Sequence, residues 1–416
     1  ELSNTIVYSL AFDPEDSAVV YAGTSTLGVL KSTSAGQSWV EANEGFTSYL
    51  VRAVAVHPET ATIYGGSSSG LFISADSGET WEAASPNPEI YSLAIDPFST
   101  DNIYTGTNRG IFLTTDEGET WSPLNNNLTN PYVYAIAFHP QNSGELYVGT
   151  DGDGVFKSVS GGAGWEPVNE GIDSLQVLSL AIAPKSPYPI FAGTREGGIF
   201  MSTDSGATWT TLSAYLAYET ITSIAINPDD TDIMYAGTEG QGFFKSTNAG
   251  LTWSIGDEDI YDKTVYYLCL DPQDSQTLFV ALAGDVKIYS INTPPDKPYD
   301  PIPENGAVDQ PTTPTLSWSG SDPDPGDSVT YEVYFGTEEE FDDNSSMTTV
   351  ATPSFTPETL ELSRTYYWKV SAIDSKNART EGDVWSFSTI ISNPPLAPAS
   401  PSPANGATNQ TLWRLS

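Results

Sequence analysis

The sequence predicts an all-β protein, a seven-bladed β-propeller followed by a C-terminal β-sandwich. First, an apolar segment ending at a proline recurs seven times before residue 292, at intervals of 39 to 44 residues. Second, each copy has room for four short strands, which is the strand content of one propeller blade. Third, four segments of the last third of the chain alternate with period two, as half-buried sandwich strands do. The seven prolines are Pro14, Pro58, Pro97, Pro140, Pro184, Pro228 and Pro272.

The first copy shows the elements of one blade. An inner strand ends before Pro14, a second follows at residues 21–24, a third at 28–32, and a fourth begins at Trp39. A single four-stranded sheet cannot bury both faces, so several must pack side by side around an axis. Seven copies therefore predict seven blades over residues 1–292. The seventh copy lacks a tryptophan strand, so either residues 1–6 supply its fourth strand or the blade has only three.

A turn motif, S-x-D-x-G-x-T-W, separates the third and fourth strands. It is complete at residues 74–81 and 202–209 and nearly complete at 114–121, and weaker copies end at Trp39, Trp165 and Trp253. We interpret the aspartates as turn caps and the tryptophans as packing residues, because a turn carboxylate of this kind binds its own loop. The motif residues expected to be structural are Asp76, Trp81, Asp116, Trp121, Asp204 and Trp209.

These motifs resemble the Asp-box, or bacterial neuraminidase repeat, of sialidases, xyloglucanases, the sortilin ectodomain and the photosystem II assembly propeller. The resemblance implies a β-hairpin turn in which the glycine takes a positive φ. The resemblance also shows which catalytic features of these families this sequence lacks. A sialidase grips its substrate with three arginines, and the only arginines before residue 292 are Arg52, Arg109 and Arg195, without the family's Arg-Ile-Pro segment. Xyloglucanases of this class use two facing propellers, and this chain holds one.

The C-terminal third divides into three parts. Residues 293–302 are predicted to be a proline-rich, extended linker. Residues 303–391 resemble a fibronectin type III module, most specifically at 362–372. Residues 403–410 repeat 303–310, so residues 392–416 are expected to hold a linker and the start of an incomplete second module.

Composition excludes several function classes. Lys and Arg total 15 against 54 Asp and Glu, a formal net charge of −39, which repels nucleic acid. The single Cys269 permits no intramolecular disulfide. The two histidines, His57 and His139, each precede a turn proline and are interpreted as turn caps rather than as metal ligands or catalysts. No run of apolar residues is long enough for membrane insertion. We expect an extracellular or cell-surface setting.

One acidic turn is a candidate metal site. Asp322, Asp324 and Asp327 could supply three carboxylates to calcium, although an ordinary acidic turn explains the same spacing. No other cofactor is expected.

The candidate functional face is formed by the loops between second and third strands, which should share one rim with the connections between blades. Aromatic residues of those connections, with charged and amide groups beside them, suggest a glycan- or protein-binding platform. The aromatic residues are Phe46, Tyr49, Tyr91, Tyr132, Tyr134, Tyr215, Tyr218 and Tyr261. The candidate binding residues are Arg109, Asp153, Arg195, Glu196, Glu239 and Gln241.

The leading hypothesis is a non-enzymatic, secreted or surface binding and scaffold protein. One alternative is a glycoside hydrolase acting on extracellular polysaccharide, for which Asp153 and Glu196 are the candidate catalytic pair, since glycoside hydrolysis needs two carboxylates at a defined separation. A second alternative is a structural subunit of an extracellular layer or filament. The sequence determines neither the ligand nor the oligomeric state.

Overall fold

The computed structural model describes residues 2, 5–84, 88–324, 327–341, 347–375 and 378–391. The chain divides into two compact units, Glu1–Ile291 and Asn292–Ser416. Both are built from β-strands, and the one helix in the described ranges is a 3-10 turn, η1 (Glu258–Ile260). No helix of the described chain has the length and apolar character needed to cross a membrane.

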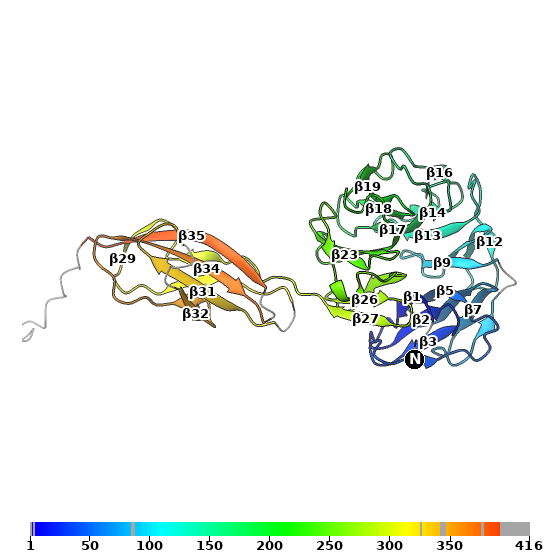
Figure 1. The fold of residues 1–416 in the computed structure, drawn as a ribbon, viewed down its shortest axis with the longest axis horizontal. Helices are drawn as coiled ribbons and strands as arrows, with labels where there is room; N and C mark the ends of the chain where they lie inside the picture. Colours follow the sequence, from blue (N-terminus) through cyan, green and yellow to red (C-terminus); the bar gives the residue numbers. More distant parts are fainter. Residues whose placement is uncertain are drawn as a thin grey trace, which may run out of the picture. The chain divides into compact units, whose positions relative to one another are not determined.

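The described part of the first unit holds six four-stranded sheets and one three-stranded sheet, each an antiparallel meander in chain order (Figure 1). Sheet one contains β1 (Val7–Phe12), β2 (Val20–Thr24), β3 (Val29–Ser32) and β4 (Val40–Glu41). Sheet two contains β5 (Val51–Val56), β6 (Ile63–Ser67), β7 (Gly70–Ser74) and β8 (Glu82–Ala83). Sheet three contains β9 (Ile90–Ile95), β10 (Ile103–Thr107), β11 (Gly110–Thr114) and β12 (Ser122–Pro123). Sheet four contains β13 (Val133–Phe138), β14 (Leu146–Thr150), β15 (Val155–Ser158) and β16 (Glu166–Pro167).

The remaining three sheets continue the same order. Sheet five contains β17 (Val177–Ile182), β18 (Ile190–Thr194), β19 (Gly198–Ser202) and β20 (Thr210–Thr211). Sheet six contains β21 (Ile221–Ile226), β22 (Ile233–Thr238), β23 (Phe243–Thr247) and β24 (Ser254–Ile255). Sheet seven contains β25 (Tyr267–Leu270), β26 (Thr277–Ala281) and β27 (Val286–Ser290).

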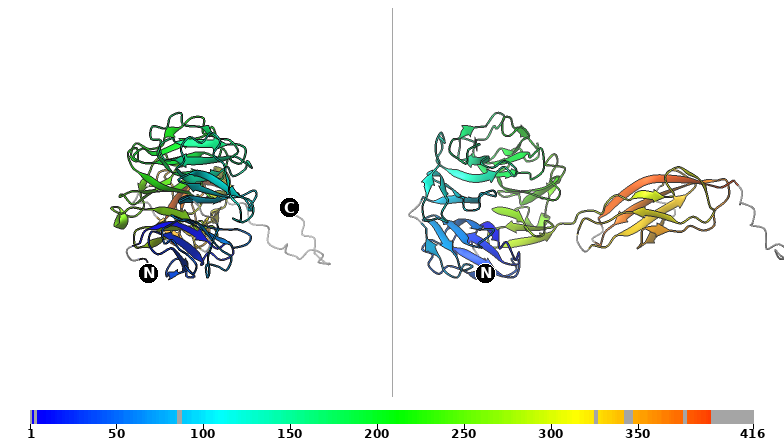
Figure 2. Two further views of the ribbon diagram at one scale, coloured as in Figure 1. Left: turned by 90° about the vertical axis from the view of Figure 1, so that its right-hand side faces the viewer. Right: turned by 180° about the vertical axis from the view of Figure 1, so that it is seen from behind.

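The seven sheets close into a ring. The first strand of each sheet contacts the first strand of the next, from β1 and β5 through to β21 and β25, and β25 in turn contacts β1. Figures 1 and 2 show these first strands around the middle of the unit, with the later strands of each sheet toward its outside. All second strands of sheets one to six are fully buried, because they lie between two neighbouring sheets.

The glycine repeated in every second strand of sheets one to six allows this close packing. A Cβ on Gly106 would lie 2.8 Å from the carbonyl oxygen of Val133, in the first strand of the next sheet. The same position in sheet one, Gly23, approaches the carbonyl oxygen of Val51 to 3.0 Å. A side chain here would therefore push two sheets apart, which explains the Tyr-x-Gly-Thr spacing of the repeat.

Sheet seven has three strands in the described part of the chain, one of the two outcomes expected from the sequence. The N-terminal segment lies beside it without adding a full strand. Ile6 forms an isolated antiparallel bridge with Ala283, and the Val7 backbone N–H donates to the Leu282 carbonyl at 3.4 Å. Leu2 is buried in the same apolar cluster as Val286. These contacts join the two ends of the ring.

The second unit is a sandwich of two sheets. A three-stranded sheet contains β28 (Tyr299–Ile302), β30 (Leu316–Ser319) and β33 (Ser354–Phe355). A five-stranded sheet contains β29 (Ala307–Gln310), β31 (Thr330–Gly336), β32 (Met347–Val350), β34 (Thr365–Ile373) and β35 (Arg379–Thr389). Leu316 and Trp318 from the first sheet share one buried cluster with Trp368, Val370 and Trp385 from the second. The core face expected from the alternating pattern is therefore the one that is buried.

Part of the segment expected to be a free linker belongs to this sandwich. Residues 299–302 form β28, which pairs with β30 at the edge of the three-stranded sheet. An edge strand tolerates Pro301 because it has a side without ladder hydrogen bonds. The predicted second module, residues 392–416, lies outside the described residues.

Candidate functional site

One rim of the ring is formed by two kinds of segment held together by backbone hydrogen bonds. These are the turns between second and third strands and the connections from one sheet to the next. The Asn108 N–H donates to the Glu89 carbonyl at 3.1 Å, the Arg195 N–H to the Gln176 carbonyl at 2.9 Å, and the Glu239 N–H to Thr220 at 3.1 Å. The rim is thus a fixed surface rather than a set of independent loops.

The residues predicted for binding are spread over four sheets of this rim. Arg109 is exposed, and only its backbone is hydrogen-bonded, to Thr107 and Asn125. Arg195, Glu196 and Glu239 are also exposed. Gln241 accepts a 2.9 Å hydrogen bond from the Tyr261 hydroxyl, which joins a predicted loop residue to a predicted connection residue.

The candidate catalytic carboxylates, Asp153 and Glu196, lie in the turns of sheets four and five. Asp153 Oδ2 accepts a 2.6 Å hydrogen bond from the Thr129 hydroxyl, whereas Glu196 is tied through its backbone N–H to the Thr220 hydroxyl at 3.2 Å. Within the described ranges the two residues have no hydrogen-bonding partner in common. Asp153 is therefore held by the connection that precedes its sheet, and Glu196 by the connection that follows its sheet.

The aromatic residues of the connections fall into three groups by exposure, of which Tyr91 and Tyr134 form the half-buried one. Phe46 is buried, stacked on Phe72 and packed edge-on against Trp81, so it belongs to the core and not to a platform. The exposed members are Tyr49, Tyr132, Tyr215, Tyr218 and Tyr261.

Sequence reasoning assigned Tyr91 and Tyr134 to the aromatic connections but missed the cluster to which they belong, at the start of the first strands. The second residue of six first strands, and the equivalent Tyr266 just before β25, occupy one position in the ring. In five successive sheets, from seven through one to four, these residues contact or electrostatically influence their neighbours, and we call this set the tyrosine–arginine arc. The arc consists of Tyr266, Tyr8, Arg52, Tyr91 and Tyr134.

Arg52 is the centre of the arc. Its guanidinium lies over the ring of Tyr8, at 5.2 Å from the centroid, and over that of Tyr91, at 5.5 Å. Its Nε donates to Glu89 Oε1 at 3.1 Å, and the other Glu89 oxygen accepts from the Tyr91 hydroxyl at 3.2 Å. Tyr8 meets Tyr266 edge-on at 5.9 Å. The available signal was a run of tyrosines at one repeat position.

The pKa values of three arc tyrosines, Tyr91, Tyr134 and Tyr266, are raised, so their hydroxyls remain protonated at neutral pH. Burial, followed by the Glu89 carboxylate, raises the pKa of Tyr91 to about 12. Burial and the hydrogen-bonding carboxylate of Asp151 raise the pKa of Tyr134, and the nearby Arg195 opposes this shift. These hydroxyls are therefore hydrogen-bond donors and not candidates for anionic nucleophiles.

The turn motifs connect third and fourth strands, at the opposite end of each sheet from the rim. Their aspartates hydrogen-bond to their own turns. Asp76 Oδ1 accepts from the Thr80 N–H at 2.8 Å and from the Ser74 hydroxyl at 2.8 Å, while its Oδ2 accepts from the Thr80 hydroxyl at 2.5 Å. Gly78 has a φ of 86°. Hydrogen bonds of this kind hold the pKa of each complete-turn aspartate at about 2. The three aspartates are Asp76, Asp116 and Asp204.

The motif tryptophans differ in which carbonyl accepts the hydrogen bond from their indole N–H. Trp81 donates its indole N–H to the Ala42 carbonyl at 2.8 Å, and Trp209 donates to the Val168 carbonyl at 2.8 Å, so both tie their sheet to the preceding one. Trp121 donates to Gly118 within its own turn at 3.1 Å. None of these interactions leaves a motif side chain directed at a ligand.

Both histidines cap turns, as the sequence predicted. His57 Nδ1 accepts from the backbone N–H groups of Glu59 and Thr60, each at 3.2 Å. His139 accepts equivalent bonds, and Asn227 accepts them through its side-chain oxygen at the same repeat position.

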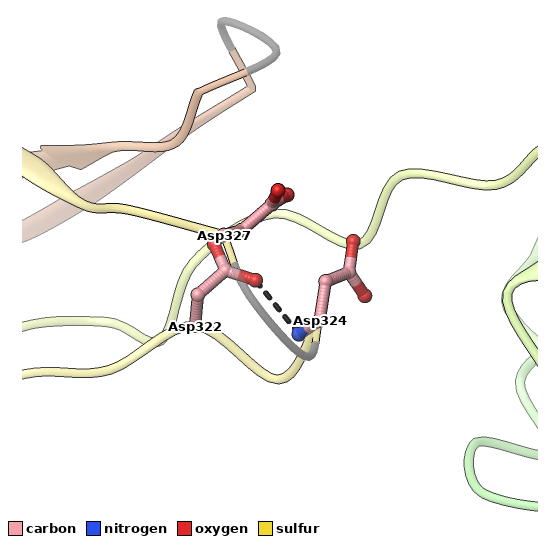
Figure 3. A group of neighbouring side chains, drawn as sticks. All are labelled: Asp322, Asp324 and Asp327. Atoms are coloured by element: carbon pink, nitrogen blue, oxygen red, sulfur yellow. Dashed lines mark hydrogen bonds between the residues drawn. The ribbon is translucent and has the colours of Figure 1, made fainter.

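The acidic turn of the second unit gathers its three carboxylates. One oxygen from each of Asp322, Asp324 and Asp327 lies within 4.8 Å of the others (Figure 3). The Asp324 N–H donates to Asp322 Oδ1 at 2.8 Å. Burial, then the charges of Asp324, Asp327 and Asp374, raise the pKa of Asp322. Calcium takes several carboxylate oxygens in a variable geometry, so these three residues are the ones that could hold a cation.

Comparison with known proteins agrees with the ring geometry. Residues 69–191 match the family model described as "Sortilin, neurotensin receptor 3". YCF48 from Cyanidioschyzon merolae is similar in structure, with a TM-score of 0.54 and 17% identity over 70% of this chain and 96% of that one. The fold is a β-propeller.

Two further solved propellers are similar. The structure titled "YCF48 bound to D1 peptide" has a TM-score of 0.56 at 15% identity, covering 70% of this chain and 95% of its own. The GH74 xyloglucanase from Xanthomonas campestris has a TM-score of 0.56 at 14% identity, covering 92% of this chain and 80% of its own. At identities this low, the similarity establishes the propeller fold and nothing about function. The sequence has no match among curated proteins.

Proposed function

We propose that this chain is a secreted or cell-surface binding and scaffold protein with no catalytic role. Its seven sheets act as the blades of a seven-bladed Asp-box propeller whose rim recognises a glycan or another protein. The sandwich, a fibronectin type III-like module, serves as a spacer. The formal net charge of −39 supports an extracellular setting, because such acidity keeps a protein soluble there and repels polyanions.

The observation that carries this proposal is the exposure of tyrosines on a rigid polar rim. Tyr132, Tyr215 and Tyr218 are 42%, 59% and 85% exposed. Tyrosine offers an apolar ring and a hydroxyl at a small entropic cost, so rigid surface tyrosines are typical of recognition surfaces. The backbone bonds between turns and connections fix the rim before any ligand arrives, which reduces the cost of binding.

The structural neighbours support binding of either ligand class. One is a propeller bound to a peptide, and another is an enzyme named for a polysaccharide. The second candidate function is accordingly glycoside hydrolysis, with Asp153 and Glu196 as the acid and its partner carboxylate. Of these two carboxylates, Asp153 is the one whose side chain is fixed by a hydrogen bond, which it accepts from the Thr129 hydroxyl. A third candidate, a structural subunit of an extracellular layer or filament, predicts regular self-association without a ligand.

The test uses the full chain on arrays of extracellular glycans and secreted proteins. We expect a specific ligand whose binding falls at least about tenfold when Tyr132 and Tyr218 are both changed to serine, the loss of roughly 1.4 kcal/mol. The matched control is Leu251→Ser, which removes a 65% exposed apolar side chain from a turn motif instead of the rim.

Hydrolysis is tested on the same glycans by product analysis. Release of oligosaccharides that disappears in Asp153→Asn and Glu196→Gln would replace the binding proposal with the enzyme. Failure to bind any glycan or protein, together with concentration-dependent filaments, would replace it with the structural subunit.

A further inference from the structure

We propose that the tyrosine–arginine arc is a subsite for one uncharged sugar unit of a glycan. This inference rests on the proposed binding function and deepens it by naming the place and the ligand chemistry. Two of its members, Tyr91 and Tyr134, were predicted from the sequence as aromatic residues of the connections, whereas the predicted charged and amide residues belong to the turns between second and third strands. The arc itself is formed at the start of the first strands.

A β-bulge in each of six first strands creates the arc's position. In β1 the register shifts between Val7 and Ser9, which leaves Tyr8 as the extra residue. The same shift occurs at the second residue of β5, β9, β13, β17 and β21. A bulge redirects the side chain of its extra residue and is common beside functional sites. The fold therefore directs one side chain per sheet to the same end of the ring.

What occupies that position varies around the ring while its neighbours do not. The preceding residue is Val or Ile in all seven copies and is fully or almost fully buried. The bulge residue is aromatic or Arg on one side of the ring, and Leu178 and Thr222 in sheets five and six. A packing requirement would repeat as the valines do. The asymmetry indicates instead a ligand that lies over sheets seven, one, two, three and four.

The donor groups of Arg52 are held ready for a ligand. Two tyrosine rings and Glu89 fix the guanidinium through its faces and its Nε. In the described part of the chain its two terminal amino groups donate no hydrogen bond, and 31% of the side chain is exposed. A planar guanidinium fixed in this way presents paired donors without further loss of side-chain freedom. Such donors match adjacent hydroxyl oxygens.

Local charge favours a neutral ligand over an anion. The Glu89 carboxylate balances Arg52 at 3.1 Å, and near Tyr134 the Asp151 carboxylate likewise opposes the charge of Arg195. Glu239 acts on Tyr266 with the same sign. An anionic ligand would meet these carboxylates and the field of a chain with net charge −39. A sugar ring instead packs its C–H face on the tyrosines and exchanges hydrogen bonds with Arg52, the carboxylates and the hydroxyls.

The experiment titrates the full chain with neutral hexasaccharides of glucose, xylose, mannose and galactose, and with hexagalacturonate as the anionic probe. Binding is followed by calorimetry and by the fluorescence of the protein. The arc variants are Tyr8→Leu, which keeps apolar bulk but removes the flat ring, and Arg52→Gln, which keeps length but removes the charge. Thr222→Ser, at the same bulge position on the opposite side of the ring, is the matched control.

We expect at least one neutral hexasaccharide to bind, with hexagalacturonate at least about tenfold weaker, and each arc variant to weaken binding by about tenfold or more while Thr222→Ser changes it little. Circular dichroism and thermal unfolding establish that each variant is folded. Should a saccharide bind with unchanged affinity to folded Tyr8→Leu and Arg52→Gln, the arc assignment is wrong although the binding function stands. Preference for hexagalacturonate would overturn the charge argument. Binding of a protein and of no saccharide would overturn the inference and leave the binding function in place.

Discussion

Two buried tyrosines at one repeat position differ in whether the hydroxyl has a partner, and this difference predicts different effects of the same substitution. Tyr147 and Tyr64 are both fully buried in second strands. The Tyr147 hydroxyl lies 2.6 Å from Glu145 Oε1 and 3.1 Å from the Ser205 carbonyl in the next sheet's turn. The Tyr64 hydroxyl is buried without a hydrogen-bonding partner in the described part of the chain.

The magnitudes follow from these contacts. A hydrogen bond to a charged group contributes about 1.5–3 kcal/mol. Glu145 keeps Lys157 at 2.9 Å as a partner, so no carboxylate is left uncompensated. We therefore expect Tyr147→Phe to lower the free energy of unfolding by about 2 kcal/mol. Removing the unpaired hydroxyl in Tyr64→Phe relieves a desolvation cost, and we expect a change between zero and a gain of about 1 kcal/mol.

Urea unfolding of the full chain, followed by tryptophan fluorescence, measures both variants. Because the ring and side-chain volume are unchanged in each, the pair isolates the hydroxyl. A loss in Tyr64→Phe equal to that in Tyr147→Phe would refute the reasoning, since it would mean that partnering at this position does not decide the contribution.

Three further predictions concern the caps and the carboxylates. His57→Asn should preserve stability, because Asn227 caps the equivalent turn, whereas His57→Ala should lose about 1 kcal/mol in urea unfolding; equal losses would contradict the capping role. The lowered pKa of Asp76, about 2 against 3.8 unfolded, contributes stability above pH 4 that is lost as the pH falls toward 2; Asp76→Asn should flatten this acid limb, and an unchanged limb would count against it. The pKa of Asp322 is raised, so its ionised form is disfavoured in the folded unit and stability falls as pH rises through the folded pKa. Without divalent cations Asp322→Asn should raise the melting temperature at neutral pH, and millimolar calcium should stabilise the original chain more than the variant; equal shifts would exclude Asp322 as a ligand.

The repeat made much of the first unit predictable. A copy that recurs seven times averages out local ambiguity, so the strand order and the turns at Asp76 and Asp204 followed from spacing alone. The sandwich strands were predictable from alternation around Trp318 and Trp368, which are buried as expected. The start of the second unit within residues 293–302 was not predictable from the sequence. Its prolines are equally typical of an extended linker and of the edge strand that residues 299–302 form.

The candidate site was less predictable for a definite reason. Loop residues such as Arg109 and Glu196 attract attention in a sequence because they vary between copies. The position of Tyr8, Arg52 and Tyr91 also varies between copies, but the bulge that directs these side chains leaves no signal in the sequence, since a bulge depends on the pairing of two strands and not on the residues of one. Phe46 illustrates the converse error, because its place in a connection did not reveal that Trp81 and Phe72 cover it.

In a ring of repeated sheets, structural and ligand-contacting positions can be separated by asking which must be equal in every copy. Close packing between sheets must recur, and so the glycines near Val51 and Val133 recur in sheets one to six. A ligand smaller than the ring contacts only some copies, and so its contacts must differ between them. The bulge position meets this second condition while lying next to residues that meet the first. The side of the ring with Leu178 and Thr222 then needs no aromatic residue, because the ligand would not reach it.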